Sequence, residues 1–323
     1  MENGISIIIC CYNSERTIKR TIEHIIAQSN VEDINKELIV VDNNCTDSTI
    51  SIIRAFDSLT IPIYVVKEIT PGLMSARKSG INHARYSLIQ FCDDDNFLCK
   101  NYLATIWNLM QDTKIGACGG QGIAIVDNGI LPEWFEKIQG GYACGNQLAE
   151  SGKCNFLYGA GLCIRKSILD FISAQGINYL LSGRKSNTLL SGDDTELCCF
   201  IRQMGLTLWY EDSISFQHCL PSSRLTQEYA IKMFYGFGIA VPVIDVYNCA
   251  LRNYKVTYWH LCKQLVKSIW DYILMKTKRD NRKNLYSKLD MSVAKGRMNG
   301  YITFKFKKLL QQYYIFKEIP KYA

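Results

Sequence analysis

The stretch YSLIQFCDDD, residues 86–95, ends an apolar run with three consecutive aspartates. The run predicts a buried strand that leads directly into the acids. Asp93, Asp94 and Asp95 repel one another at a strand end, and a divalent cation with oxygen ligands, together with a polyphosphate, would offset that cost. A solvated turn is the alternative, because aspartate side chains also stabilise turns by hydrogen bonds to the backbone. The stretch alone therefore leaves two interpretations open, a metal-diphosphate site and a turn.

The chain on both sides of this stretch repeats one order, a short apolar run followed by a helical pattern. Repeated units of this kind predict an α/β fold with a parallel sheet covered by helices. The predicted pairs are Ile5–Cys11 with Thr17–Gln28, Glu37–Val41 with Thr46–Phe56, Ile63–Val66 with Leu73–Ala84, and Ser87–Cys92 with Lys100–Met110. Ligands bind such sheets beyond the carboxyl ends of the strands. We therefore expect the site among the residues that follow each run.

Charge is distributed unevenly along the 323 residues. Residues 250–323 carry 17 Lys and Arg against 4 Asp and Glu, whereas residues 1–249 carry 20 against 26. Such polarity indicates a separate role for the basic tail, for example at an anionic membrane or a nucleic acid. We expect a catalytic domain over 1–249, with halves at about 1–115 and 116–249, and a helical tail over 250–323. The 48% apolar content suffices for a sizeable core.

The fourteen cysteines lie mostly inside apolar runs, and no CxxC pair is present. This pattern favours reduced core thiols over disulfides or a zinc site. The first predicted strand begins at Ile5 without a charged and apolar leader before it, and no run of 18 uncharged apolar residues appears. We therefore expect a cytoplasmic protein without a membrane span.

Two further acids and one arginine stand where ligand contacts are expected. Asp42 ends a predicted strand and could accept hydrogen bonds from a nucleotide base or ribose, or could only cap its turn. Arg77 begins a predicted helix and could meet phosphate, or could be an ordinary surface arginine. Asp193 and Asp194 open another predicted helix, where they could complement the helix dipole or supply a general base.

His218 follows the apolar run Ser213–Phe216 and could complete a metal shell of mixed oxygen and nitrogen ligands. A lone histidine is more often structural, so its role stays open at this point.

The motifs together have a recognisable order. They are SIIICCYN (6–13), ELIVVDNNCTDST (37–49), PGLMSARKSG (71–80), FCDDDN (91–96), GAGLCIRKS (159–167), GDDTEL (192–197) and the histidine at 218. Over roughly residues 4–240 the chain resembles glycosyltransferase family 2, the inverting enzymes of the GT-A fold. This resemblance implies a hexosyltransferase-type enzyme with a mostly parallel central sheet, helices on both faces and a basic helical C-terminal region.

The resemblance also implies a role for each matching residue. Tyr12 and Asn13 would lie beside the nucleotide, Asp42 would bind its base, and Arg77 would support the diphosphate. Asp93 would touch ribose or metal, and Asp95 would ligate Mn²⁺ or Mg²⁺. Asp194 would be the catalytic base. Gly159, Ala160 and Gly161 would floor the acceptor and donor-sugar pocket, with Asp193 beside it. The reaction would move a sugar from a nucleotide-diphosphate sugar to a hydroxyl of a glycan or lipid-linked acceptor, in bacterial cell-surface polysaccharide or glycolipid synthesis.

The chain departs from the family pattern at three points. Cys10-Cys11 stands where Pro-Thr is common, Asn43-Asn44 follows Asp42 in place of Asp-Gly or Asp-Ser, and Asp193 replaces the commoner Glu. The first departure weakens any hydrogen bond from position 11 to the base, and the third leaves the role of Asp193 uncertain.

The basic tail contains a helical apolar pattern over Tyr258–Leu274. Its apolar stripe either packs on the catalytic domain or lies in a membrane interface, with Trp259 and Trp270 at the lipid and the KTKR segment (276–279) near anionic headgroups. The second interpretation predicts a peripheral protein on the inner face of the cytoplasmic membrane.

Three other functions can be compared with this interpretation. A nucleic-acid-binding protein could use the basic tail, but no known reader motif is present, and we expect no nucleic-acid partner. A sugar-phosphate nucleotidylyltransferase shares the sheet architecture but should have a Gly-rich basic loop after the first strand. A dinucleotide oxidoreductase needs GxGxxG there, and Cys-Cys-Tyr-Asn-Ser-Glu stands in that place.

Overall fold

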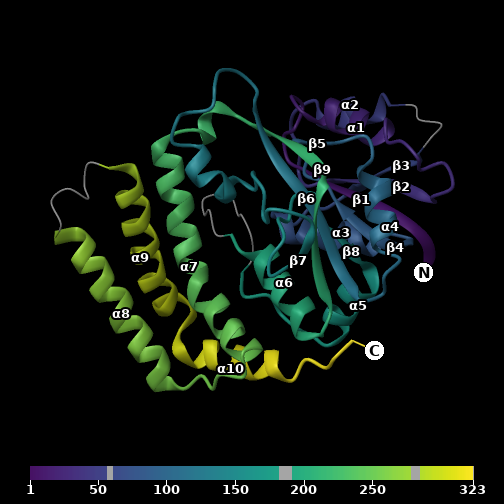
Figure 1. The fold of residues 1–323 in the computed structure, drawn as a ribbon. Helices are drawn as coiled ribbons and strands as arrows, with labels where there is room; N and C mark the ends of the chain where they lie inside the picture. The colour runs from purple at the N-terminus through teal and green to yellow at the C-terminus, as the bar shows by residue number, and fades with distance from the viewer. Residues whose placement is uncertain (57–60, 182–190, 278–283, 323) are drawn as a thin grey trace. The chain divides into compact units, whose positions relative to one another are not determined.

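The computed structural model describes residues 1–56, 61–181, 191–277 and 284–322 (Figure 1). They form two compact units. Unit 1 comprises Met1–Ile177 and Leu206–Pro221, and unit 2 comprises Asn178–Gly205 and Ser222–Ala323. The change of charge at residue 250 does not coincide with this division, because it falls inside unit 2 at the end of its first long helix.

Unit 1 is built on a nine-stranded sheet with the order β3-β2-β1-β4-β8-β6-β9-β5, and β7 pairs with β9 beside this path. The strands are β1 (Glu2–Cys11), β2 (Lys36–Asp42), β3 (Ile63–Lys67), β4 (Tyr86–Phe91), β5 (Asn96–Leu98), β6 (Ile115–Val126), β7 (Gly152–Cys154), β8 (Cys163–Arg165) and β9 (Thr207–Leu220). The predicted α/β fold is confirmed, with parallel pairing throughout β3-β2-β1-β4 and between β6 and β9. Strands β5, β7 and β8 run antiparallel to their neighbours.

Helices cover both faces of this sheet. They are α1 (Ile18–Ile26), α2 (Thr49–Arg54), α3 (Leu73–His83), α4 (Tyr102–Leu109) and α5 (Lys166–Ala174), with the 3-10 helix η1 (Glu136–Tyr142). Alternate residues of a strand point to opposite faces. Ile7 therefore joins a core that includes Ile22 of α1 and Leu103 of α4, whereas Ile8 meets Gly80 of α3 on the other side.

The second half of the sheet contains a tight turn inside an apolar run. The apolar run Phe156–Ile164 forms a strand only at its end, in β8, because the chain turns at Gly161. Gly161 has a φ of +72°, and a Cβ there would lie 2.6 Å from the hydroxyl oxygen of Tyr102. Tyr102 donates a hydrogen bond to the Gly161 carbonyl at 2.6 Å and accepts one from the Gly120 N–H at 3.2 Å. The buried Tyr102 thus fixes the turn at Gly161, which the apolar sequence pattern does not indicate.

Unit 2 is helical. It contains α6 (Asp193–Gln203), the 3-10 helix η2 (Ser222–Arg224), α7 (Gln227–Leu251), α8 (Tyr258–Thr277), α9 (Leu285–Phe304) and α10 (Phe306–Lys317). Helix α9 contacts both α7 and α8 (Figure 1). Gly238 and Gly296 permit close approach of α7 and α9, because a Cβ on Gly238 would lie 2.3 Å from the Val293 carbonyl oxygen. Among the described helices, α7 alone is long and apolar enough to span a bilayer, with a mean hydropathy of 1.4 and 44% of that stretch buried.

Candidate functional site

The polar residues predicted after the first two strands gather at one sheet edge because β1 and β2 are parallel and end in register, with Cys11 opposite Asp42. The Asn43 N–H donates to the Cys11 carbonyl at 3.0 Å and so joins the two strand ends. Tyr12 follows β1 with 66% of its surface exposed. An exposed aromatic ring at a strand end can stack on a nucleotide base.

Asn13 and Asp42 both shape the loop after β2. The Asn13 Oδ1 accepts a hydrogen bond from the Thr46 N–H at 2.8 Å, and Asn13 itself adopts a left-handed conformation with φ of 55°. The Asp42 Oδ1 accepts from the Cys45 N–H at 2.9 Å. These bonds show turn-forming roles for both side chains, and their predicted nucleotide contacts stay predictions.

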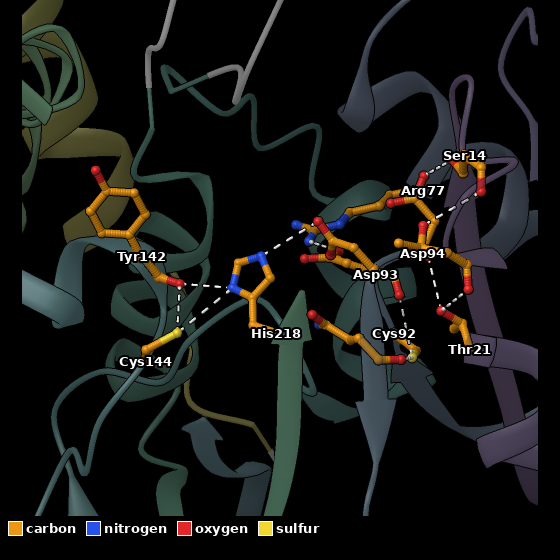
Figure 2. A network of polar contacts seen from close by, with 12 residues as sticks. Ser14, Thr21, Arg77, Cys92, Asp93, Asp94, Tyr142, Cys144 and His218 are labelled. Atoms are coloured by element: carbon orange, nitrogen blue, oxygen red, sulfur yellow. Dashed lines mark hydrogen bonds and ion pairs between the residues drawn. The ribbon is translucent and has the colours of Figure 1, made fainter. Parts of the chain in front are cut away.

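The three consecutive aspartates have different partners, and Figure 2 labels two of them, Asp93 and Asp94. A carboxylate oxygen of Asp94 accepts a hydrogen bond from the Ser14 hydroxyl, and its carbonyl accepts from Thr21 Oγ1 at 2.9 Å. Asp94 therefore ties the acid loop to the start of α1. Asp93 lies opposite Arg77 of α3, with 3.9 Å between Oδ1 and a guanidinium nitrogen. The structure thus brings together an aspartate and an arginine that are separated by 16 positions in the chain.

Asp95 faces His218, with 3.5 Å between Oδ2 and Nε2. Strand pairing produces this contact, because β5 and β9 are antiparallel with Asn96 opposite His218. The Cys219 N–H also donates to the Asp95 carbonyl at 2.9 Å. On its other side, His218 Nδ1 lies 2.8 Å from the Tyr142 carbonyl oxygen. A carbonyl only accepts, so Nδ1 carries the proton and Nε2 is directed at Asp95.

Burial and charge determine the protonation of the groups near the acids. Burial lowers the pKa of His218, but the charge of Asp95 and hydrogen bonds with Asp95 and Cys144 raise it more, to about 10. Burial raises the pKa of Cys10 to about 12, and it raises the pKa of Cys92 well above its ordinary value. Both thiols are therefore neutral at physiological pH, whereas His218 carries a proton on each ring nitrogen and pairs with Asp95. A cation that binds Nε2 would have to displace that proton.

Asp95 and His218 present one oxygen and one nitrogen atom, which are donor types that divalent cations bind. Two ligand atoms of one Mn²⁺ or Mg²⁺ lie about 3 Å apart, close to the separation of Asp95 and His218. A hydrogen bond from the far ring nitrogen to a carbonyl is typical of metal-binding histidines. Within the described ranges, no group of three His, Cys, Asp or Glu side chains forms a metal site. Phosphate oxygens and water would complete the shell, as Mg²⁺ sites commonly require.

Asn96 adds a second indication. Its side chain is fully buried, and neither its amide oxygen nor its amide nitrogen has a hydrogen-bond partner in the described part of the chain. An orphaned buried amide costs about 1–3 kcal/mol. Asn96 lies opposite His218 in the strand pairing, so this unsatisfied amide belongs to the same region as the Asp95–His218 pair.

The predicted pocket segment Gly159–Gly161 is buried in unit 1, at the turn fixed by Tyr102. Asp193 and Asp194 belong to unit 2, where they open α6 after Gly192. Asp193 is buried and Asp194 is partly buried. The Asp194 Oδ1 accepts a hydrogen bond from the N–H of Thr195 at 2.7 Å. Its contribution to catalysis stays a prediction.

Several residues that contact the aspartates or His218, or lie beside them, were not predicted from the sequence. They are Ser14, Thr21, Asn96, Tyr142 and Cys144. Ser14 directly follows the motif SIIICCYN and Asn96 is the last residue of FCDDDN, so their positions were a usable signal. Tyr142 acts through its backbone carbonyl, and no side-chain pattern marks such a role.

Comparison with known proteins identifies a family for most of unit 1. The family model "Glycosyl transferase family 2" matches residues 6–171. Glycosyltransferase GlyA of Streptococcus pneumoniae is 26% identical over 107 residues, covering 33% of this chain and 15% of GlyA. Minor teichoic acid biosynthesis protein GgaA of Bacillus subtilis is 30% identical over 146 residues, covering 44% of this chain and 30% of GgaA. The chain thus matches less than a third of the length of these two relatives.

Two solved structures share the fold over most of the chain. TarS 1–349 of S. aureus has a TM-score of 0.50 at 13% identity and covers 94% of this chain and 92% of its own. Mannosyltransferase PcManGT of Pyrobaculum calidifontis, in complex with GDP-Man and Mn²⁺, has a TM-score of 0.51 at 15% identity. The match covers 98% of this chain and 74% of PcManGT. At these identities the likeness shows the fold alone.

Proposed function

This chain belongs to glycosyl transferase family 2, and from that premise we propose that it transfers a sugar from a nucleotide-diphosphate sugar to a hydroxyl of a glycan or lipid-linked acceptor. The proposed setting is the synthesis of a bacterial cell-surface polysaccharide or glycolipid. Teichoic acid and poly-N-acetylglucosamine are named among the products of relatives, which supports this class of acceptor.

The observation that carries the proposal is the pairing of Asp95 with His218 beside the pairing of Asp93 with Arg77. An oxygen and a nitrogen donor suit a cation, and a guanidinium suits a diphosphate. Asp95 and His218 would hold Mn²⁺ or Mg²⁺, which when bound would neutralise charge on the leaving diphosphate. The exposed ring of Tyr12 is available for the nucleotide base.

The proposed base is Asp194. It would take the proton of the acceptor hydroxyl while that oxygen forms a bond to the anomeric carbon. The bond from that carbon to the diphosphate oxygen breaks with its electron pair, and a nucleoside diphosphate leaves. Because one displacement occurs and no enzyme nucleophile intervenes, the anomeric configuration inverts.

A donor-binding screen combined with one variant tests this function. Calorimetry with UDP-, GDP- and dTDP-sugars, with and without Mn²⁺, should find one class that binds more tightly with the cation. With that donor, Asp194→Asn should lower kcat by about 10²–10⁴-fold, the usual contribution of a general base, while donor affinity stays unchanged.

Asp170→Asn is the matched control, because Asp170 is an exposed helix acid whose partner is Lys166. It should leave both quantities as in the wild type. Full turnover in Asp194→Asn would exclude Asp194 as the base, and the absence of binding to any nucleotide-sugar would overturn the function itself.

We also propose that unit 2 contacts an anionic membrane through the outer face of α8, defined as Trp259, Val266, Trp270, Ile273 and Leu274. These side chains are 67%, 64%, 60%, 45% and 41% exposed, respectively. The opposite side of α8, with Leu261 and Ser268, is buried, and α8 packs on α9.

Basic residues accompany this face. Lys263, Lys267 and Lys276 are exposed on α8, and the Lys263 ammonium lies 5.3 Å from the Trp259 ring centre. Lys278 and Arg279 of the predicted basic cluster lie outside the described residues. Exposed tryptophans beside lysines are typical of helices at the surface of anionic bilayers. A peripheral position on the cytoplasmic face of the membrane would give access to a lipid-linked acceptor.

Vesicle co-sedimentation tests the membrane contact. Trp259→Ser with Trp270→Ser should weaken binding to phosphatidylglycerol vesicles by about 10-fold or more, since each side chain buries a large apolar surface. Ile130→Ser removes another side chain, 89% exposed in unit 1, and should have no effect. Equal binding of both variants would refute a membrane role for this face.

A further inference from the structure

Glu196 is a fully buried carboxylate in the first turn of α6, two positions after the proposed base. Its Oε1 accepts a hydrogen bond from the Leu180 N–H at 2.9 Å, and its Oε2 accepts from the Leu181 N–H at 2.8 Å. The Tyr247 hydroxyl of α7 donates to Oε1 at 2.5 Å. With these three donors and no exposed surface, Glu196 is unsuited to contact substrate. Its contacts instead join α6 to the preceding segment and to α7.

The network continues into the last helix of the chain. The Gln312 side-chain amide of α10 donates to the Tyr247 hydroxyl oxygen at 2.8 Å and to the Asn178 carbonyl at 3.2 Å. Gln312 is 6% exposed. One hydroxyl and one amide thus connect three helices and the segment at Asn178. Because these polar groups are buried, loss of one partner leaves another unsatisfied and weakens the connection between the helices.

An aromatic cluster surrounds this network. The Tyr247 ring lies 4.6 Å from the Phe316 ring of α10 and 5.6 Å from the Phe200 ring of α6, measured between ring centres. Tyr179 packs against Phe200 at 5.3 Å. These rings exclude water from the hydrogen bonds and restrict their geometry, which strengthens the coupling of the helices.

We propose that Glu196, through Tyr247 and Gln312, is a positioning residue that holds the first turn of α6 in its catalytic orientation, with Gln312 as the one contribution of α10 to this network. This inference rests on the proposed function of Asp194. It gives the C-terminal region two separate tasks, since α8 presents a face to the membrane while α10 supports the base. Deletion of residues 255–323 would remove both and could not distinguish them, whereas single substitutions can.

The test compares two tyrosines of unit 2 that lose the same atom. Tyr247→Phe removes the hydroxyl that contacts Glu196, and Tyr313→Phe removes a hydroxyl of α10 that donates to the Tyr254 carbonyl at 3.0 Å. Tyr247→Phe should lower kcat by roughly 10-fold, with KM for the donor unchanged, because misplacing a catalytic group affects the chemical step more than binding. Tyr313→Phe should lose about as much thermal stability as Tyr247→Phe does, but it should retain wild-type kcat.

Two further measurements complete the test. Gln312→Leu should reproduce a weaker form of the kcat loss, and Glu196→Gln, which keeps the volume and one acceptor, should retain more activity than Glu196→Ala. Hydrogen exchange, monitored by mass spectrometry, should be faster at the Leu180 and Leu181 amides and in the first turn of α6 in Tyr247→Phe than in Tyr313→Phe.

The exchange result does not depend on which residue is the base. Faster exchange together with full activity in Asp194→Asn would retain the network as a support of α6 and refute only the proposed function of Asp194. Equal exchange and an equal loss of kcat in the two tyrosine variants would overturn the positioning role.

Discussion

The acids of the two units differ in their partners. Asp93 and Asp95 of unit 1 are half-buried and face cationic or protonatable groups, Arg77 and His218. Glu196 of unit 2 is fully buried and accepts hydrogen bonds from neutral donors. The first arrangement pairs carboxylates with charged or protonatable side chains, and the second surrounds one carboxylate with neutral donors. Both occur in short acidic strings, DDD and DDTE, so environment decides which acid can do chemistry.

Replacement of His218 by glutamine should have the largest effect among the tests of this comparison. Glutamine can still donate to the Tyr142 carbonyl but removes the imidazole nitrogen that faces Asp95. We expect the apparent affinity for Mn²⁺ in the presence of donor to fall by about 100-fold, measured by calorimetry.

His83→Gln is the control for this measurement, because His83 is exposed on α3 and contacts only the Ser79 carbonyl among the interactions described for its ring. Wild-type Mn²⁺ affinity in His218→Gln would place the cation elsewhere and remove the contrast between the units.

The buried acid of unit 2 should appear in the pH dependence of stability. Burial raises the pKa of Glu196 from 4.5 to about 7, although the Leu180, Tyr247 and Leu181 donors lower it, and Asp193 raises it further. The folded state therefore holds this proton more tightly than the unfolded state. The resulting stabilisation is fully present below pH 4.5 and is lost as pH rises through about 7.

Between pH 5.5 and 8 this carboxyl should account for a loss of about 2 kcal/mol in the free energy of unfolding. Denaturant titration of the wild type and of Glu196→Gln would measure it, since glutamine cannot titrate. Tyr247 and Cys199 also lie near this group, but burial raises the pKa of each beyond this range. Identical pH profiles in the two proteins would show that Glu196 keeps one charge state throughout.

The smallest expected effect concerns Tyr12 of unit 1. Tyr12→Ala should weaken donor binding by about 10-fold, because stacking of one base contributes about 1–3 kcal/mol, and Tyr12→Phe should bind as the wild type does. Tyr64, 43% exposed on β3, provides a matched control. A loss in Tyr64→Ala as large as in Tyr12→Ala would indicate a general effect on unit 1.

The local pattern of apolar residues was sufficient to predict the strands and helices in the first half of unit 1. Strands β1 to β4 and helices α1 to α4 lie within a few residues of their predicted ranges, because each has a clear apolar run or helical stripe of its own. Strands β6 and β9 were not predicted, since Gly-rich sequence and interrupted alternation obscure β6 and polar residues at 211–213 interrupt β9. The amphipathic helix of the tail was predicted to within three residues of its end, but not which of its apolar residues would remain exposed.

The sequence by itself determined the family, the α/β architecture and the acids worth testing, because these depend on the order and spacing of residues along the chain. Tertiary structure alone decided their partners. The pairing of His218 with Asp95 requires β9 beside β5, and the contact of Gln312 with Tyr247 requires α10 beside α7. Such contacts join residues 65 or more positions apart, and the free energy that selects them comes from burial and satisfied hydrogen bonds, which no local pattern records.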